Sequence, residues 1–315
     1  MALFAAWLQE FAAKSKSKFV RDSERLLQQL LEMDRKSPPE YSYRVDKPGV
    51  VTWNPFTVEE FKSPEYSPTD DEYERMPIQE YNTMYWASQA RLIEMYDVTT
   101  LWRFTGLAKS TLEKLNAQDI VTPVILSRSM LELTSYMIAN MNRVYRLVEM
   151  IYEKASTDGI NTSTQLSQIL SRMVWGTRLE GLQKEHGFEK QTGIMEVVRG
   201  VSKGNAWAAD LVDIYDYLCE FAHPNYLGNV RFWEFPDKDG LTITLKRDAE
   251  SDRTHEAREM ILWSVGWSVV AFFYALEMAQ TAIMMLSEKF IKMEKGFGFL
   301  VYGVPRINLK EYSKP

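Results

Sequence analysis

Apolar residues recur at helical spacing over most of the chain, which predicts a mainly α-helical protein. We predict helices over 2–33, 76–97, 98–116, 123–154, 161–184, 189–202 and 205–222, and a long final helix over about 254–294. The clearest stripe lies in 123–154, where apolar residues step by three and four positions: Leu126, Met130, Leu133, Met137, Met141, Val144, Val148 and Ile151. These residues share one helix face, so we expect a helical bundle with that face in its core.

The long final helix contains a nearly continuous apolar run from Ile261 to Leu286. This length is enough for a membrane span. However, Glu277 and Gln280 interrupt the run, and a helix that is apolar on all sides is also typical of the centre of a large bundle. We favour a central core helix and do not expect membrane association, with a membrane span as the alternative.

Two segments depart from the helical pattern. Residues 36–75 carry six of the twelve prolines, and proline breaks helices. We therefore divide the chain into an N-terminal amphipathic helix (1–35), a proline-rich connector (36–75), a helical bundle domain (76–295) and a tail (296–315) without an assigned role. Within the bundle domain, alternating apolar residues on both sides of Asp237-Lys238-Asp239-Gly240 predict a β-hairpin over about 230–246.

Composition limits the classes of function. The net charge is −6, which disfavours non-specific nucleic-acid binding because such proteins neutralise phosphates with basic residues. Cys219 is the single cysteine, so neither an intramolecular disulfide nor a cysteine-based zinc site can form. The apolar start lacks a basic leader and is broken by Glu10, which argues against a secretory signal. We therefore expect a cytoplasmic protein.

The helix over 123–154 carries an ionic pair in an apolar setting. Arg128 and Glu132 lie one turn apart, and Val124, Ile125 and Leu131 flank them. We therefore expect the first half of this helix to be buried on both sides, where the two charges need each other or a further partner. The alternative is an ordinary surface ion pair. Thr122 is the expected N-cap of this helix, with Pro123 as its first residue.

A second set of polar residues lies at the end of the helix over 205–222. Glu220 occupies the last turn, where the helix dipole disfavours negative charge, and we expect Arg128 to compensate it. His223 precedes Pro224, so the helix should end there. The alternative is that His223 caps the helix while Glu220 is exposed. Glu220-x-x-His223 also has the spacing of a metal-ligand pair, but the chain offers no convincing second copy. We expect neither a metal nor a cofactor.

These two segments carry a resemblance. The stretches RSMLE from Arg128 and YDYLCEFAHPN from Tyr215 resemble those of a family of all-helical bacterial proteins with Arg-Ser-x-x-Glu and Glu-x-x-His-Pro-Asn motifs. That family is distantly similar to HEPN-like helical bundles, and the resemblance covers about 76–290. Active HEPN ribonucleases use an Arg and a His, four to six residues apart, at a dimer interface. In this chain, the positions before His223 where such an Arg would stand are occupied by Asp216, Tyr217 and Leu218, so the Arg is absent there.

The sequence therefore supports two hypotheses. The first is a binding or regulatory module in which Arg128, Glu132, Glu220 and His223 form a polar cluster that recognises a small polar ligand or a partner. The second, implied by the resemblance, is a metal-independent, dimeric endoribonuclease of stress or phage defence with the same four residues as its catalytic set. The expected partners are a second copy of the chain or another protein. RNA is a candidate and DNA is not.

Overall fold

The fold is mainly α-helical, as the sequence predicts. The structure is a computed structural model that describes residues 2–37, 40, 44–47, 50–52, 78–153, 159–186, 190–223, 229, 233–234, 244–245, 252–291 and 304–313. Its α-helices are α1 (Ala6–Lys14), α2 (Lys18–Lys36), α4 (Ile78–Asn116), α5 (Val121–Glu153), α6 (Gly159–Trp175), α7 (Glu180–His186), α8 (Ile194–Gly204), α9 (Leu211–Ala222) and α11 (Asp252–Leu286). Shorter helical turns are η1 (Ala206–Ala208), η2 (Ser287–Ile291) and η3 (Leu309–Tyr312).

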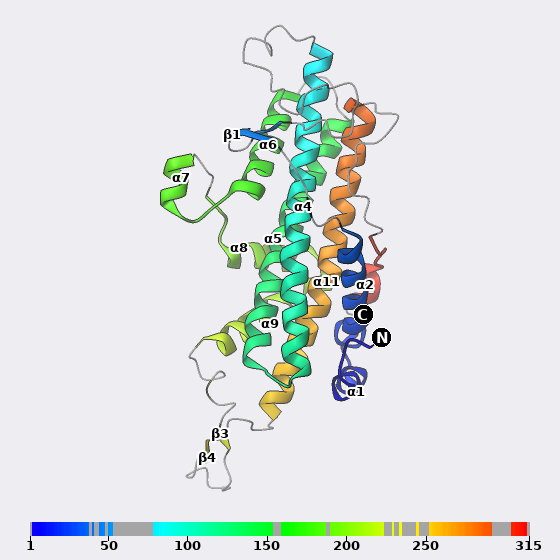
Figure 1. Ribbon diagram of the computed structural model, residues 1–315, viewed down its shortest axis with the longest axis vertical. Coiled ribbons are helices and arrows are strands. Elements are labelled where there is room, and N and C mark those ends of the chain that lie inside the picture. Colours follow the sequence, from blue (N-terminus) through cyan, green and yellow to red (C-terminus); the bar gives the residue numbers. More distant parts are fainter. Residues whose placement is uncertain are drawn as a thin grey trace.

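Three long helices form the body of the bundle. α4, α5 and α11 lie side by side along the longest axis of the molecule, with α4 antiparallel to α5 (Figure 1). α2 packs on α11, and α8 and α9 pack on α5. The N- and C-terminal ends lie close together beside α2 (Figure 1).

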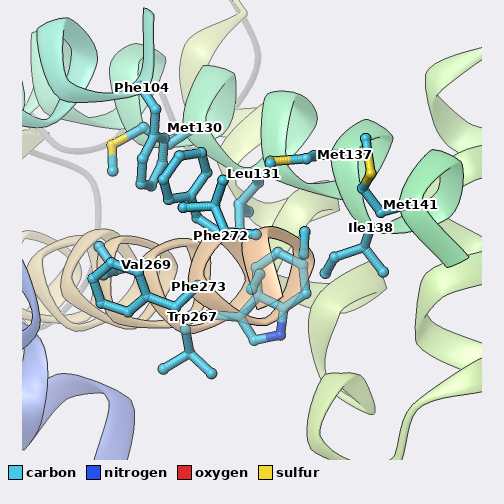
Figure 2. Close-up of a cluster of buried hydrophobic side chains, with 14 of the residues drawn as sticks. Phe104, Met130, Leu131, Met137, Ile138, Met141, Trp267, Val269, Phe272 and Phe273 are labelled. Carbon is cyan, nitrogen blue, oxygen red and sulfur yellow. The ribbon is translucent and has the colours of Figure 1, made fainter. Parts of the chain in front are cut away.

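The core lies between α4, α5 and α11. Phe104 of α4 stacks on Phe272 of α11 with ring centroids 4.8 Å apart, and Trp207 stacks on Trp267 at 5.4 Å. Figure 2 shows the apolar side chains of α5 meeting those of α11 at this interface. The stripe predicted on α5 therefore faces the core, with Leu126 and Leu133 only partly buried at its edge.

α11 is the predicted central helix. The stretch from Thr254 in α11 to Phe290 in η2 is, in the described part of the chain, the one helical segment long and apolar enough to cross a membrane. Its most apolar stretch is mostly buried inside the bundle, and every residue from 261 to 273 is buried. This is how the core helix of a bundle is covered.

Several predicted helix boundaries were wrong. The segment 2–33 forms two helices, because Ser15 donates a hydrogen bond to Glu259 and accepts the N–H of Ser17 at 3.0 Å, which breaks the helix there. The segments 76–97 and 98–116 form the single helix α4. The segment 161–184 divides into α6 and α7 near Gly176, where a Cβ atom would lie 2.3 Å from Arg172 O.

The start of α5 differs by two residues from the prediction. The helix begins at Val121, whose N–H donates to Asp119 Oδ1 at 3.0 Å, so Asp119 rather than Thr122 satisfies the free N–H group. Pro123 lies in the first turn, where a missing N–H costs nothing.

Two short hairpins complete the described structure. β3 (Trp233–Glu234) pairs antiparallel with β4 (Thr244–Leu245), with Trp233 opposite Leu245, which confirms the hairpin predicted over about 230–246. β1 (Arg44–Lys47) pairs with β2 (Val50–Thr52) inside the proline-rich connector, where no strand was predicted. Most of that connector, and part of the tail 296–315, lie outside the described residues.

The described part of the tail packs on α2. Tyr312 stacks on Phe19 with ring centroids 4.8 Å apart, and its hydroxyl donates to Asp22 Oδ2 at 2.8 Å. Lys18 pairs with Glu311 at 3.3 Å. The tail, for which no role was predicted, thus packs the C-terminal segment against α2.

Candidate functional site

A polar cluster joins α5 to the end of α9. We define the polar cluster as Arg128, Glu132, Tyr215 and His223. Arg128 Nε donates to Glu132 Oε1 at 3.1 Å, and one of its terminal nitrogens lies 3.3 Å from His223 Nε2. The Tyr215 hydroxyl donates to Glu132 Oε1 at 2.8 Å. Two stretches of chain 95 residues apart therefore meet at one place, as the sequence predicted for Arg128 and His223.

The contact between Arg128 and His223 links the guanidinium of α5 to the imidazole at the end of α9. A guanidinium only donates hydrogen bonds, so His223 Nε2 is the accepting atom of this contact. His223 is the C-cap of α9, has an extended backbone (φ −91°, ψ 164°) and is exposed. This is the helix end expected before Pro224.

Tyr215 of α9 is the member of the cluster that was not among the predicted site residues. Its ring is 2% exposed and lies 5.5 Å from the Arg128 guanidinium carbon. Burial raises the pKa of the Tyr215 hydroxyl, and its hydrogen bond to Glu132 raises that pKa further. Its position could have been found from spacing, because Tyr215, Cys219 and His223 recur every four residues and share one face of α9.

Cys219 lies between Tyr215 and His223 on this face and is half-buried. Burial raises the pKa of its thiol, although the nearby Arg128 charge lowers it. The thiol is therefore protonated at neutral pH, which does not favour a nucleophilic role. Burial alone lowers the pKa of Arg128, but its hydrogen bond to Tyr215 and the surrounding groups outweigh this and raise it.

Glu220 is exposed on the last turn of α9, the turn in which the sequence placed it. The hydrogen bonds that define the polar cluster run through Tyr215. Three of the four predicted site residues, Arg128, Glu132 and His223, belong to this cluster.

The expected two-sided burial of the first half of α5 was wrong. Val124 and Leu131 are fully buried, but Ile125 is 45% exposed. The side chains of Arg128 and Glu132 are 26% and 31% exposed. The polar cluster is therefore half-buried and reachable from solvent.

A cavity of about 880 Å³ begins at the polar cluster and runs between α4 and α5. We call it the α4–α5 cleft. It is lined by Tyr96, Trp102, Arg103, Gly106, Leu107, Ser110, Ser129, Glu132, Leu133, Tyr136, Asn140, Met173, Val174, Gly176 and Gln191. Glu132 belongs both to the polar cluster and to the lining. Trp102, Arg103 and Ser110 are exposed, so the cleft opens to solvent. No pattern in the sequence had predicted this cleft.

The metal-ligand spacing noted in the sequence does not assemble a centre in the described residues. Across those residues, no group of three or more His, Cys, Asp or Glu side chains is close enough to hold a metal ion. His255 is exposed and packs on Phe11 with ring centroids 4.7 Å apart. The side chain of His186 lies outside the described residues.

Comparison of the chain with protein-family models, with curated proteins and with solved structures finds no match.

Proposed function

We propose that this protein is a binding module that holds a small polar ligand in the α4–α5 cleft, with the polar cluster as its charged wall. The observation that carries the proposal is that Glu132 belongs both to the polar cluster and to the lining of the cleft. Arg128 and Tyr215 both hydrogen-bond to Glu132 Oε1, and the same side chain lines the cleft.

The cluster is held in place before any ligand arrives. Tyr215 is fixed by the core and positions Glu132, while Glu132, Tyr215 and His223 together orient the Arg128 guanidinium. Polar groups that are ordered in advance lose little entropy on binding, which favours affinity. The volume of the cleft also falls within the range of about 300–1,000 Å³ found for small-molecule sites. Cys219, as a lone thiol, suits a reducing cytoplasm, where we place this function.

A thermal-shift screen tests the proposal. The purified chain is heated with a panel of carboxylates, amines, sugars, nucleotides and other phosphates. We expect at least one compound to raise the melting temperature of the wild type and to lose this effect in Arg128→Gln and Glu132→Gln. Arg306→Gln, which removes a charge from the exposed C-terminal segment, is the matched control and should respond as the wild type does. A screen without hits, or hits that persist in both cluster variants, would contradict the proposal.

A second candidate is the metal-independent endoribonuclease. It is favoured by one contact, the 3.3 Å approach of Arg128 to His223 Nε2 at an exposed position. A neutral imidazole can accept the proton of an attacking 2′-hydroxyl, and a guanidinium can bind the phosphate. Arg128 would supply from α5 the cation that the resemblance expects next to His223 on α9. In this candidate the protein acts on RNA as a dimer, in stress or phage defence.

The ribonuclease candidate has a direct test. Purified protein is incubated with total cellular RNA in the presence of a chelator, alongside His223→Ala and the control His255→Ala. Cleavage by the wild type and by the control, but not by His223→Ala, supports the candidate. RNA that stays intact with the folded wild type counts against it.

A further inference from the structure

We propose that the ligand of the α4–α5 cleft is a free nucleotide, recognised by arginines that bind its phosphates and by Trp102, which stacks on its base. This inference rests on the proposed function and names the ligand class of that site. It is carried by the charges, the aromatic surface and the length of the cleft.

The cleft carries an excess of positive charge. Arg103 lines it, is exposed and forms no ion pair with any residue that the structure describes. Arg178, which is not part of the lining, donates to the hydroxyl of the lining residue Tyr136 at 3.2 Å and to Thr192 O at 3.1 Å, both neutral acceptors. Glu132, the one acidic residue among the described residues of the lining, is already neutralised by Arg128. Guanidinium groups without carboxylate partners are suited to phosphate oxygens.

An exposed aromatic ring lies next to this charge. Trp102 is 36% exposed and lines the cleft beside Arg103, its neighbour on α4. A large aromatic ring at a solvent-open cleft offers a flat surface on which any base can stack. The lining also contains side-chain amides and hydroxyls, those of Asn140, Gln191 and Ser110, which can hydrogen-bond to a base or a ribose.

The dimensions fit a ligand longer than a simple anion. The lining on α5 runs from Ser129 to Asn140, about 16 Å at the α-helical rise per residue. This is enough for a base, a ribose and phosphates in an extended arrangement, whereas inorganic phosphate would leave most of the volume unfilled. A free nucleotide fits better than a nucleic-acid strand because the chain carries a net charge of −6, which repels a long polyanion.

The test is a set of binding isotherms measured by calorimetry. The probes are the four ribonucleoside monophosphates, their triphosphates, adenosine, inorganic phosphate and a ten-residue oligouridylate. We expect at least one nucleotide to bind the wild type. Arg103→Gln should weaken that binding by tenfold or more, and Trp102→Leu should weaken nucleotide binding more than phosphate binding. Arg306→Gln should bind as the wild type does, and circular dichroism checks that each variant is folded.

The outcomes separate the inference from the proposed function. The inference is overturned if the folded wild type binds no nucleotide, if Arg103→Gln binds with unchanged affinity, or if the oligouridylate binds more tightly than every free nucleotide. If a different metabolite binds and is lost in Arg128→Gln, the proposed function stands and the inference fails. If nucleotide binding is lost in Arg103→Gln but unchanged in Arg128→Gln and Glu132→Gln, the inference stands and the role proposed for the polar cluster fails.

Discussion

At the scale of single residues, the polar cluster combines one fully buried group with three that reach solvent. Tyr215 is anchored in the core, and its hydroxyl reaches Glu132 at the edge of the cleft. Because Glu132 also accepts from Arg128, the charges of these two side chains balance each other.

Removing the Tyr215 hydroxyl should destabilise the protein without disturbing the core. We expect Tyr215→Phe to lower the free energy of unfolding by roughly 1 to 2 kcal/mol, because a buried hydroxyl loses its bond to a partly exposed carboxylate. Urea denaturation followed by circular dichroism measures this. The control is Tyr274→Phe, a ring packed beside Trp207 whose hydroxyl donates to none of the described residues. Equal stability of Tyr215→Phe and the wild type would show that the hydroxyl contributes nothing.

Asp97 is a buried acid next to the cleft residue Tyr96. It is 4% exposed, and its Oδ1 atom has no hydrogen-bond partner in the described part of the chain. Burial raises its pKa well above the ordinary range, and the charge of Glu94 raises it further. The folded state therefore keeps the Asp97 proton at a pH where the unfolded state has lost it. By linkage, the stability that Asp97 contributes is complete below about pH 4, the unfolded pKa, and is lost as the pH rises towards the folded pKa.

Asp97→Asn should remove this pH dependence. We expect the variant to be more stable than the wild type by at least about 1 kcal/mol at pH 8, since each unit of pKa shift corresponds to about 1.4 kcal/mol. The difference should shrink as the pH falls towards 4. Melting temperatures recorded between pH 4 and pH 8 test this. A difference in melting temperature between the variant and the wild type that stays constant over the whole range would refute it.

At the scale of elements, periodicity predicted what depends on local pattern. The core face of α5, the burial of α11 and the β3–β4 hairpin follow from the spacing of apolar residues. The break between α1 and α2 does not, because it depends on the contact of Ser15 with Glu259, 244 residues away. The continuity of α4 through Asp97 likewise depends on tertiary burial, which overrides the preference of Asp for helix ends.

The candidate site, like the fold, could be predicted only in part from the sequence. The chain pattern placed Arg128, Glu132 and His223 at facing positions, and the structure brings them together. Tyr215 was not predicted as a site residue, because an aromatic ring in an amphipathic helix usually belongs to the core and only its hydroxyl hydrogen-bonds within the cluster. The α4–α5 cleft could not be predicted, because its volume depends on how closely two helices approach and on the sizes of the side chains between them.

One close approach between elements can be tested at Gly266. A Cβ atom there would lie 2.2 Å from Phe19 O, so α2 can pack on α11 only because residue 266 is a glycine. We expect Gly266→Ala to lower stability by about 1 to 3 kcal/mol, the usual cost of overpacking. In Gly200→Ala, on α8, the new methyl group meets nothing within 4 Å, and the variant should gain about 0.5 to 1 kcal/mol from reduced backbone entropy. Urea unfolding midpoints should therefore shift in opposite directions, and a loss of equal size in both would contradict the steric argument.

At the scale of the whole molecule, the two ends of the chain form successive layers on one side of α11. α2 packs on α11, and Tyr312 from the C-terminal segment stacks on Phe19 of α2. The Tyr312 hydroxyl also donates to Asp22 and accepts a hydrogen bond from the Arg25 guanidinium at 3.3 Å. α11 is therefore enclosed by α4 and α5 and by α2, and the C-terminal segment packs on α2.

This arrangement predicts what happens when the N-terminal cover is removed. Deletion of residues 1–37 takes away Leu26, Leu27 and Leu30, all buried, and exposes the face of α11 around Trp263. A large exposed apolar surface promotes association, so we expect the truncated chain to aggregate in buffer and to bind a hydrophobic dye, while the full chain remains monodisperse without detergent. Analytical ultracentrifugation compares the two, and a synthetic peptide of residues 1–37 should restore solubility to the truncated chain. A truncated chain that stays monodisperse would show that α2 is not part of the core. A full chain that stays in solution only with detergent would instead favour the membrane-span alternative for α11.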